Sequence, residues 1–181
     1  NFLPKDYTFL NYLRCHDDIG WGLDYNFLRQ FGTEEVPHKK FINAYLTGKT
    51  EDGIGRGELY NDDPKSGDAR LCGTTASLCG IERALANHNQ EQLKLAIQFH
   101  ITLHAYMFCQ NGIPILYSGD EIGQLNDYTY HQDPNKCQDS RYIHRGNFQW
   151  DLAEKRNEQG SMQNQIFSSI LKLVEIRRSK D

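Results

Sequence analysis

Hydrophobic residues along this chain gather in two short runs and in several stretches with helical spacing. The runs at residues 8–14 and 113–117 are mostly aromatic or aliphatic, and a polar cluster follows each of them directly. Such runs are typical of strands in a parallel sheet that is covered on both faces. Hydrophobic spacing and end signals predict helices at residues 24–31, 37–46, 73–85 and 91–110, and a final helix after Ser161.

The segments between these elements are long and polar. Residues 47–70 combine many glycines with many acids and predict an irregular loop, which at that length is usually functional. The order of strand, helical insertion, helix, strand, long loop and helix is typical of consecutive βα units. Two parallel strands cannot bury a core alone, so we expect further strands from a longer parent chain or from another copy.

Composition excludes several classes of protein. The 181 residues carry 20 lysines and arginines against 24 acids, a net charge of −4, which argues against a nucleic-acid partner. No apolar run approaches the roughly 18 residues of a membrane span, and no leader is visible, so we expect no membrane contact. The five cysteines lack C-x-x-C spacing and indicate free thiols in a reducing compartment, hence a cytoplasmic protein.

Acidic clusters follow both predicted strands. His16, Asp17 and Asp18 end the first, where a parallel barrel has its catalytic face, although a loop-capping pair of aspartates beside a surface histidine is the alternative. Asp120 and Glu121 end the second. Acids at two strand ends invite a two-carboxylate glycosidase, but for this second pair the residues favour a turn cap or a structural ion pair.

Two loop arginines stand close to aspartates. Arg70 follows Asp68 by two positions, and Arg141 follows Asp139 by two positions. A guanidinium can clamp a carboxylate or bridge sugar hydroxyls. A salt bridge within each loop is the ordinary alternative, and the sequence leaves both open.

Two histidines lie one helical turn apart in the longest predicted helix. His100 and His104 have the spacing of metal ligands, but no glutamate between them and no third ligand accompany the pair. Histidines packed inside the protein are therefore favoured. We expect no catalytic metal and no organic cofactor.

Four motifs, in order, carry a resemblance to a known family. They are residues 11–21 (NYLRCHDDIGW), 67–74 (GDARLCGT), 112–121 (GIPILYSGDE) and 133–145 (DPNKCQDSRYIHR). Together they resemble glycoside hydrolase family 13, the α-amylase superfamily, and within it most closely the amylosucrases. The resemblance implies a retaining α-glucosyl transferase or hydrolase that acts on sucrose and on an α-glucan or maltooligosaccharide.

The resemblance also implies a fold and its subdivision. The fold class is α/β, a fragment of a TIM (β/α)8 barrel from strand 7 to helix 8, with a helical insertion after strand 7. Residues 1–21 match barrel strand 7 and its catalytic loop. Residues 22–89 match an insertion that shapes the pocket entrance, and residues 90–181 match helix 7, strand 8, a long loop and helix 8.

Five residues match functional positions of the family. Asp17 matches the aspartate that stabilises the transition state, and His16 matches a histidine that hydrogen-bonds the glucosyl unit. Asp18 and Arg70 match positions that contact the fructosyl or acceptor side. Arg141 matches an arginine that pairs with an aspartate to close the bottom of the pocket.

The chain also departs from the family pattern. The segments that carry the nucleophilic aspartate and the general-acid glutamate have no match here, while a retaining mechanism needs two carboxyl groups about 5–5.5 Å apart. We therefore expect the isolated chain to be inactive and to self-associate. The alternatives are a fragment of an α-amylase-type or sucrose-hydrolysing enzyme, and a non-catalytic sugar-binding or assembly module.

Overall fold

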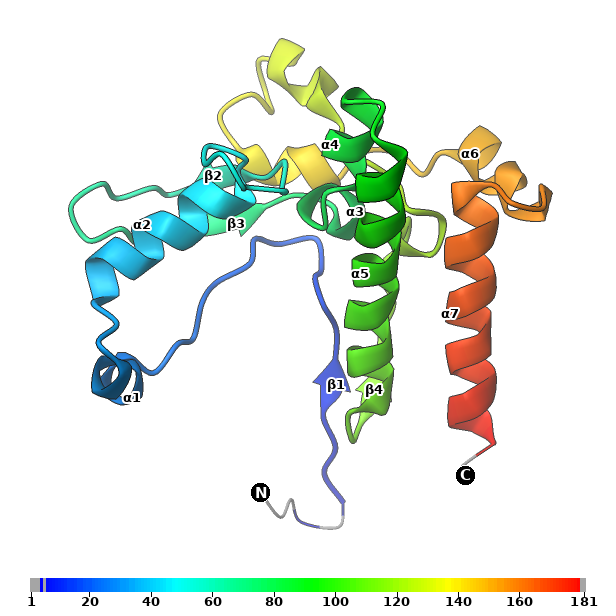
Figure 1. The fold of residues 1–181 in the computed structure, drawn as a ribbon, viewed down its shortest axis with the longest axis horizontal. Coiled ribbons are helices and arrows are strands. Elements are labelled where there is room, and N and C mark those ends of the chain that lie inside the picture. Colours follow the sequence, from blue (N-terminus) through cyan, green and yellow to red (C-terminus); the bar gives the residue numbers. More distant parts are fainter. Residues whose placement is uncertain (1–3, 5, 180–181) are drawn as a thin grey trace.

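The computed structural model describes residue 4 and residues 6–179 (Figure 1). Residues 1–3 and 5 of the expected segment 1–21, and residues 180–181 of the expected segment 90–181, lie outside the described part. The strands are β1 (Leu10–Asn11), β2 (Glu58–Tyr60), β3 (Arg70–Cys72) and β4 (Ile113–Pro114). The α-helices are α1 (Tyr25–Leu28), α2 (Glu35–Leu46), α3 (Thr75–Leu78), α4 (Ile81–Ala86), α5 (Gln90–Cys109), α6 (Trp150–Glu154) and α7 (Met162–Arg178).

The two apolar runs form strands β1 and β4, which pair in parallel. Leu10 lies opposite Ile113 and Asn11 opposite Pro114. The prediction of neighbouring parallel strands is confirmed. The prediction that they are buried is wrong, because the side chains of Leu10 and Ile113 are each more than half exposed. A sheet of two short strands has no further strand to cover either edge.

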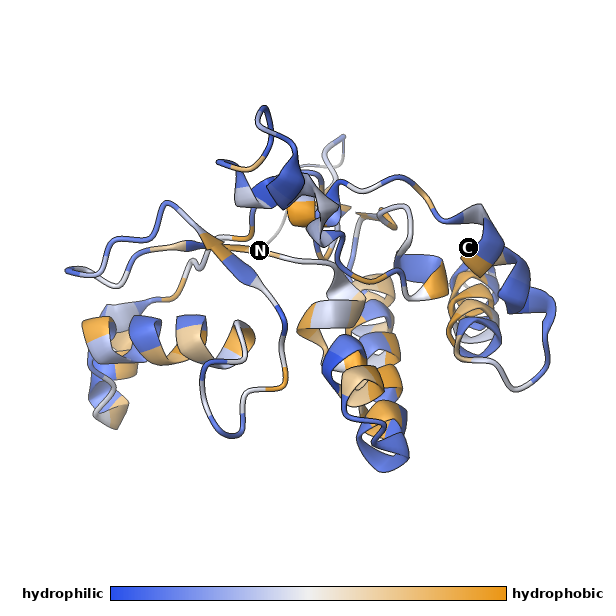
Figure 2. Ribbon diagram, turned by 90° about the horizontal axis from the view of Figure 1, so that it is seen from above, coloured by the Kyte–Doolittle hydropathy of each residue, from blue (hydrophilic) through white to orange (hydrophobic). Residues whose placement is uncertain are grey.

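The core lies between the long helices α5 and α7 and the short helices before α5 (Figure 1). Ile97 of α5 and Ile166 and Ile170 of α7 are almost fully buried there, together with Ala76 of α3 and Ile81 of α4. Apolar positions recur along the whole of α5 (Figure 2). This pattern predicts that α5 is buried on most of its faces, and the prediction is wrong for the face that carries Leu95 and Tyr106. Leu95 and Tyr106 are over 60% exposed on a face that no described element covers.

Helix ends follow the sequence signals closely. Ser161 is the N-cap of α7, and its side chain accepts the backbone N–H of Asn164. Pro37 lies in the first turn of α2, as predicted. The single helix predicted over residues 73–85 is wrong, because it breaks into α3 and α4 at Gly80. The backbone of Gly80 is left-handed, with φ of +95°, a conformation that glycine adopts without strain.

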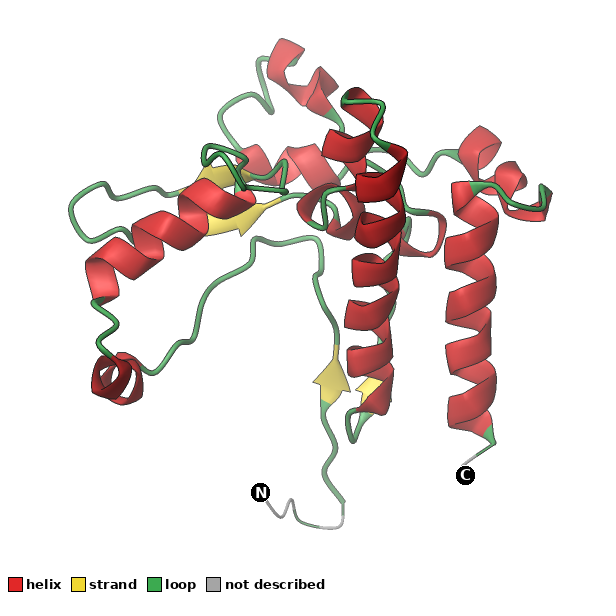
Figure 3. Ribbon diagram, viewed as in Figure 1, coloured by secondary structure: helices red, strands yellow, loops and turns green. Residues whose placement is uncertain are grey.

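The long polar stretches are more ordered than predicted (Figure 3). Residues 47–70, predicted to be irregular, contain β2, which pairs antiparallel with β3. The stretch after β4 contains α6 and several short 3-10 helices, η2 (Asp120–Ile122), η3 (Tyr128–Gln132), η4 (Ser140–His144) and η5 (Lys155–Asn157); η1 (Arg29–Phe31) follows α1. In Figure 1, α1, α2, β2 and β3 lie to one side of the α5–α7 core. Among residues 6–179, no helix has both the length and the hydrophobicity needed to cross a membrane.

Helix α7 offers a matched pair of isoleucines that tests the assignment of the core. Ile166 is fully buried and Ile176 is about half exposed on the same helix. Ile166→Ala should lower the free energy of unfolding by about 2–5 kcal/mol, because it leaves a cavity in a packed core. Ile176→Ala should change it by less than about 0.5 kcal/mol. Urea denaturation followed by circular dichroism measures both, and equal effects would contradict this core.

Candidate functional site

The loop that follows β1 carries the first predicted cluster, and its backbone is held from far along the chain. The carbonyl oxygen of His16 accepts hydrogen bonds from Nε2 of His144 at 3.2 Å and from Nε of Arg145 at 2.6 Å. Further on, Ile19 exchanges both backbone hydrogen bonds with Leu71 of β3. The loop is therefore fixed at two points by the segment after β4 and by the insertion.

Asp17 lies among three basic side chains. Its Oδ1 is 3.2 Å from Nη2 of Arg145 and 3.7 Å from Nη1 of Arg141, and its Oδ2 is 3.4 Å from Nε2 of His16. About half of the Asp17 side chain is exposed to solvent. The structure thus brings His16, Asp17 and Arg141 together and adds Arg145. The carboxylate is therefore held by charge-assisted contacts and still reaches solvent.

A cleft of about 300 Å³ opens beside this cluster. Its walls come from the ends of both parallel strands and from the long loop after β4. The lining residues are Arg14, His16, Thr74, Tyr117, Ser118, Gln124, His144, Arg145, Gly146 and Phe148. Polar and aromatic side chains that converge on a concave surface are typical of small-ligand sites.

Arg14 and Asp120 form a buried ion pair below the cleft. Nη2 of Arg14 is 2.7 Å from Oδ1 of Asp120, and neither side chain is more than 3% exposed. Thr75 joins the pair, since its hydroxyl accepts from Nε of Arg14 and donates to Oδ2 of Asp120. Burial alone would raise the pKa of Asp120, but His104 and Arg14 outweigh it and lower that pKa.

The structural interpretation of the second acidic cluster is therefore confirmed. Asp120 makes an ion pair, and Oε2 of Glu121 accepts the backbone N–H of Gly119 and so caps the turn after β4. Because Arg14 neutralises Asp120, this carboxyl is poorly suited to act as an acid or nucleophile. The glycosidase pair of strand-end acids is not formed by Asp17 and Asp120.

His100 and His104 are packed histidines, as predicted. Both are fully buried. Nε2 of His100 bonds the carbonyl of Asp120 at 2.9 Å, and Nδ1 of His104 donates to the carbonyl of His100 at 2.8 Å. Burial is the main cause that lowers the pKa of His100 to about 4. His144, which holds the carbonyl of His16, likewise has its pKa lowered to about 4, chiefly by burial.

Asp18 and Arg70 face each other at the edge of the insertion. Nε of Arg70 is 4.0 Å from Oδ1 of Asp18, and the Arg70 side chain is about half exposed. A second hollow of about 270 Å³ adjoins this pair and is lined by Arg70, Trp21, Asn61 and Asp68, among others. These two predicted residues lie together, on the side of the loop toward the insertion.

The two loop arginines resolve differently. Arg141 makes a two-pronged salt bridge within its own loop, with both contacts to Asp139 at 2.8 Å. Arg70 makes no such bridge to Asp68, which instead binds Lys39 at 2.7 Å. The salt-bridge alternative is thus correct for Arg141, which in addition reaches Asp17, and wrong for Arg70.

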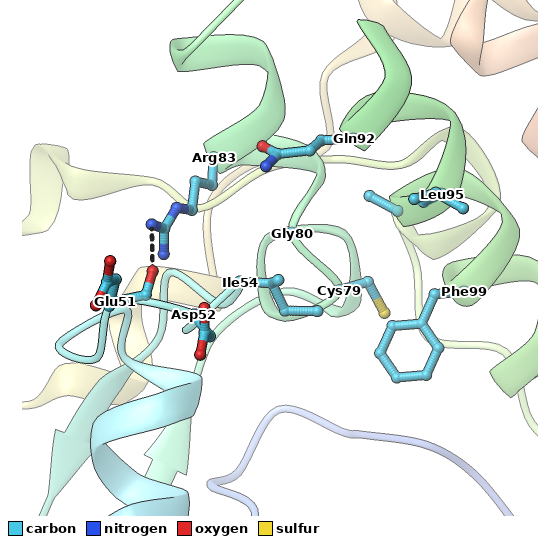
Figure 4. A pocket seen from close by; sticks show the side chains of 10 residues that line it. Glu51, Asp52, Ile54, Cys79, Gly80, Arg83, Gln92, Leu95 and Phe99 are labelled. Carbon is cyan, nitrogen blue, oxygen red and sulfur yellow. Dashed lines mark hydrogen bonds between the residues drawn. The ribbon is translucent and has the colours of Figure 1, made fainter. Parts of the chain in front are cut away.

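A separate pocket of about 420 Å³ lies between the 51–54 loop, α4 and α5 (Figure 4). Ile54, Leu95 and Phe99 give it apolar walls. Arg83 stands at its rim and donates to the carbonyl of Glu51 at 3.2 Å. It contains none of the residues predicted from the sequence, and the exposed face of α5 continues into it.

Sequence reasoning missed three residues that shape the cleft. The sequence indicates only that Arg14 ends the first predicted strand and that Tyr117 ends the second. The ring of Tyr117 lies 4.3 Å under the Arg14 guanidinium, a cation–π contact that no spacing rule reveals. Arg145 falls within the fourth motif, and its place directly after His144 was the signal that the sequence offered.

No protein-family model matches the chain. The likeness to family 13 therefore rests on the four sequence motifs.

The buried ion pair should be costly to break from one side. Asp120→Asn removes one charge and leaves Arg14 uncompensated, so the free energy of unfolding should fall by about 3–5 kcal/mol. The double variant Arg14→Met with Asp120→Leu removes both charges and should cost less than Asp120→Asn alone. Guanidinium denaturation of the wild type, Asp120→Asn and the double variant measures these free energies of unfolding. A double variant that is less stable than Asp120→Asn would contradict the pairing.

The buried neutral histidines should make stability depend on pH. His100 and His144 have pKa values of about 4 in the folded chain against 6.5 in the unfolded chain, so the unfolded chain binds more protons between these values. The contribution of these two neutral histidines to the free energy of unfolding is fully present above pH 6.5. It should fall toward pH 4 by up to about 1.4 kcal/mol per pH unit for each histidine.

Two variants separate this effect from general acid sensitivity. His100→Gln keeps a donor for the Asp120 carbonyl but cannot titrate, so its unfolding free energy should depend less steeply on pH. His88→Asn changes an exposed histidine with a left-handed backbone, which asparagine tolerates, and should keep the full slope. Urea titrations at stepped pH values give the slopes, and a His100→Gln slope equal to the wild type would refute the assignment.

Proposed function

We propose that this chain supplies the strand-7 and strand-8 side of the active site of an amylosucrase-like retaining α-glucosyl transferase or hydrolase. Its substrates are sucrose and an α-glucan or maltooligosaccharide. The single observation that carries the proposal is the position of Asp17, in the loop that follows β1, a strand that pairs in parallel with β4, beside His16 and a cleft. The carboxyl ends of parallel barrel strands are where such enzymes hold their substrates.

The side chains around Asp17 suit the role of a charge stabiliser. Arg145 and Arg141 both lie close to Oδ1 of Asp17, and about half of the Asp17 side chain remains exposed to solvent. A fixed anion next to an oxocarbenium-like centre lowers the energy of the transition state. His16 lies on the other carboxylate oxygen, where its ring can also bond a sugar hydroxyl.

Asp18 and Arg70 suit the acceptor side. They lie together on the flank of the loop that faces the insertion, and a hollow with an aromatic residue, Trp21, adjoins them. Guanidinium and carboxylate groups bond sugar hydroxyls, and aromatic rings stack on sugar faces. This pair separates the two enzymatic alternatives, because residues on the acceptor side decide between transfer to a glucan and hydrolysis by water.

The nucleophile and the general acid would come from the family's strand-4 and strand-5 segments, which have no counterpart in this sequence. The isolated chain should therefore release neither fructose nor glucose from sucrose. The protein encoded by the extended reading frame should do so. Asp17→Asn in that protein should lower kcat by at least about 10²–10³-fold, since it removes a charge aimed at the transition state.

Asp24→Asn is the matched control for this experiment. Asp24 is an exposed N-cap of α1, where asparagine caps equally well, so turnover should stay at the wild-type level. Release of fructose and growth of glycogen chains are the two readouts, and the second distinguishes transferase from hydrolase. Turnover by the isolated chain, or an unchanged kcat for Asp17→Asn, would overturn the proposal.

A further inference from the structure

We propose that Cys15, His16 and Asp17 form a binding site for a borderline-soft divalent cation such as Zn²⁺. One ligand atom from each residue lies within 4.8 Å of the others, and Nε2 of His16 is 3.4 Å from Oδ2 of Asp17. Tetrahedral zinc, with bonds of about 2.0–2.3 Å, holds its ligands about 3.3–3.8 Å apart. The histidine and the aspartate already have that separation, and a small rotation of the cysteine side chain completes the set.

The ligand types favour zinc over the harder cations. A thiolate, an imidazole and a carboxylate together select zinc, cobalt or copper, whereas magnesium and calcium prefer oxygen ligands alone. Three protein ligands leave the fourth position open to water or to an added anion.

Cys15 is better suited to bind a metal than the buried cysteines. Burial raises the pKa of both Cys72 and Cys79 to about 12, so neither thiol readily gives a thiolate. Cys15 is a free, half-buried thiol beside the cleft, and its sulfur accepts the backbone N–H of Asp17 at 3.4 Å.

The backbone beneath the three ligands is already ordered. The carbonyl of His16 is held by His144 and Arg145, so the two neighbouring residues are restrained as well. Binding therefore needs little further ordering of the chain, which favours affinity.

The charges around Asp17 divide between its two oxygens. Arg145 and Arg141 lie on Oδ1, while Oδ2 faces His16 and is the oxygen available to the cation. The arginines repel a cation, so this site should bind zinc more weakly than a structural zinc site does. Because the thiol and the imidazole must lose their protons, binding should strengthen as pH rises.

A bound cation would occupy His16 and Asp17. Under the proposed function, on which this consequence rests, these residues hold the glucosyl unit. The cation and the sugar would then exclude each other, and Zn²⁺ would act as an inhibitor that sucrose displaces.

The test is a calorimetric titration of the chelator-treated 181-residue chain with Zn²⁺, repeated with Co²⁺ while the thiolate-to-cobalt absorption band is recorded. Cys15→Ser should weaken binding by at least about tenfold and abolish that band, since it removes a direct ligand. Cys137→Ser, which changes another half-buried free cysteine, should leave both unchanged. His16→Ala, at a largely exposed side chain, should also weaken binding.

Failure of this inference is distinguishable from failure of the proposed function. Equal zinc affinity in the wild type and Cys15→Ser, or a cobalt complex without a thiolate band, would overturn the metal site and leave the glucosyl site standing. Zinc binding that depends on Cys15, in an extended protein whose sucrose turnover zinc does not inhibit, would support the metal site and contradict the role of Asp17 in holding sugar.

Discussion

The ion pair between Arg14 and Asp120 joins the two halves of this structure. Arg14 comes just after β1 and Asp120 just after β4, and both charges are almost completely removed from water. Isolated, either charge would be expensive to bury, so the pair is stable only while both strand ends keep their positions. Thr75 and His104 bring α3 and α5 to the same point. The loop that carries His16 and Asp17 follows Arg14 directly, so this ion pair fixes where the loop begins.

The apolar surface around β1 agrees with an incomplete sheet. Phe9 and Tyr12 are more than half exposed, and β1 and β4 pair only with each other among the described residues. Exposed edges and faces of this kind invite pairing with further strands. On α5, Leu95 and Tyr106 form a similar uncovered surface. A further strand beside β1 and a further helix beside α5 would bury both surfaces, which suits the proposed place in a larger barrel.

The sequence predicted best where local chemistry decides the structure. The N-cap at Ser161 and the 20-residue helix α5 depend on residues within a few positions, and both follow the rules for helix ends and hydrophobic spacing. The break at Gly80 was missed because apolar spacing continues across it, while the left-handed turn packs against Ile54 of the distant 51–54 loop. Strand β2 was missed because its three residues follow a glycine-rich stretch and pair with β3 across the polar loop 61–69, so the pairing leaves little local signal.

The candidate site likewise contains residues that the local sequence predicts and residues that only tertiary packing brings together. His16 and Asp17 could be chosen because they follow a strand, but their arginine partners lie more than 120 residues away, and the spacing of Arg141 pointed to Asp139 and not to Asp17. Arg14 was hidden inside an apolar run, where its charge gave no sign of the buried partner after β4. Spacing rules see neighbours on one element, whereas ion pairs between elements depend on tertiary packing.

Gly20 shows how the insertion and the functional loop constrain each other. A Cβ at this position would overlap the guanidinium of Arg70, so any other residue would displace the end of that side chain from its place beside Asp18. One residue earlier, the backbone of Ile19 donates a hydrogen bond to Leu71 of β3 and accepts one from it. The insertion therefore contributes the edge of the hollow at Trp21 and also holds the end of the loop that starts at Arg14. The loop is thus anchored at the carbonyl of His16 and at Ile19, and these bonds set the position of Asp17 and Asp18 relative to Arg70 of β3.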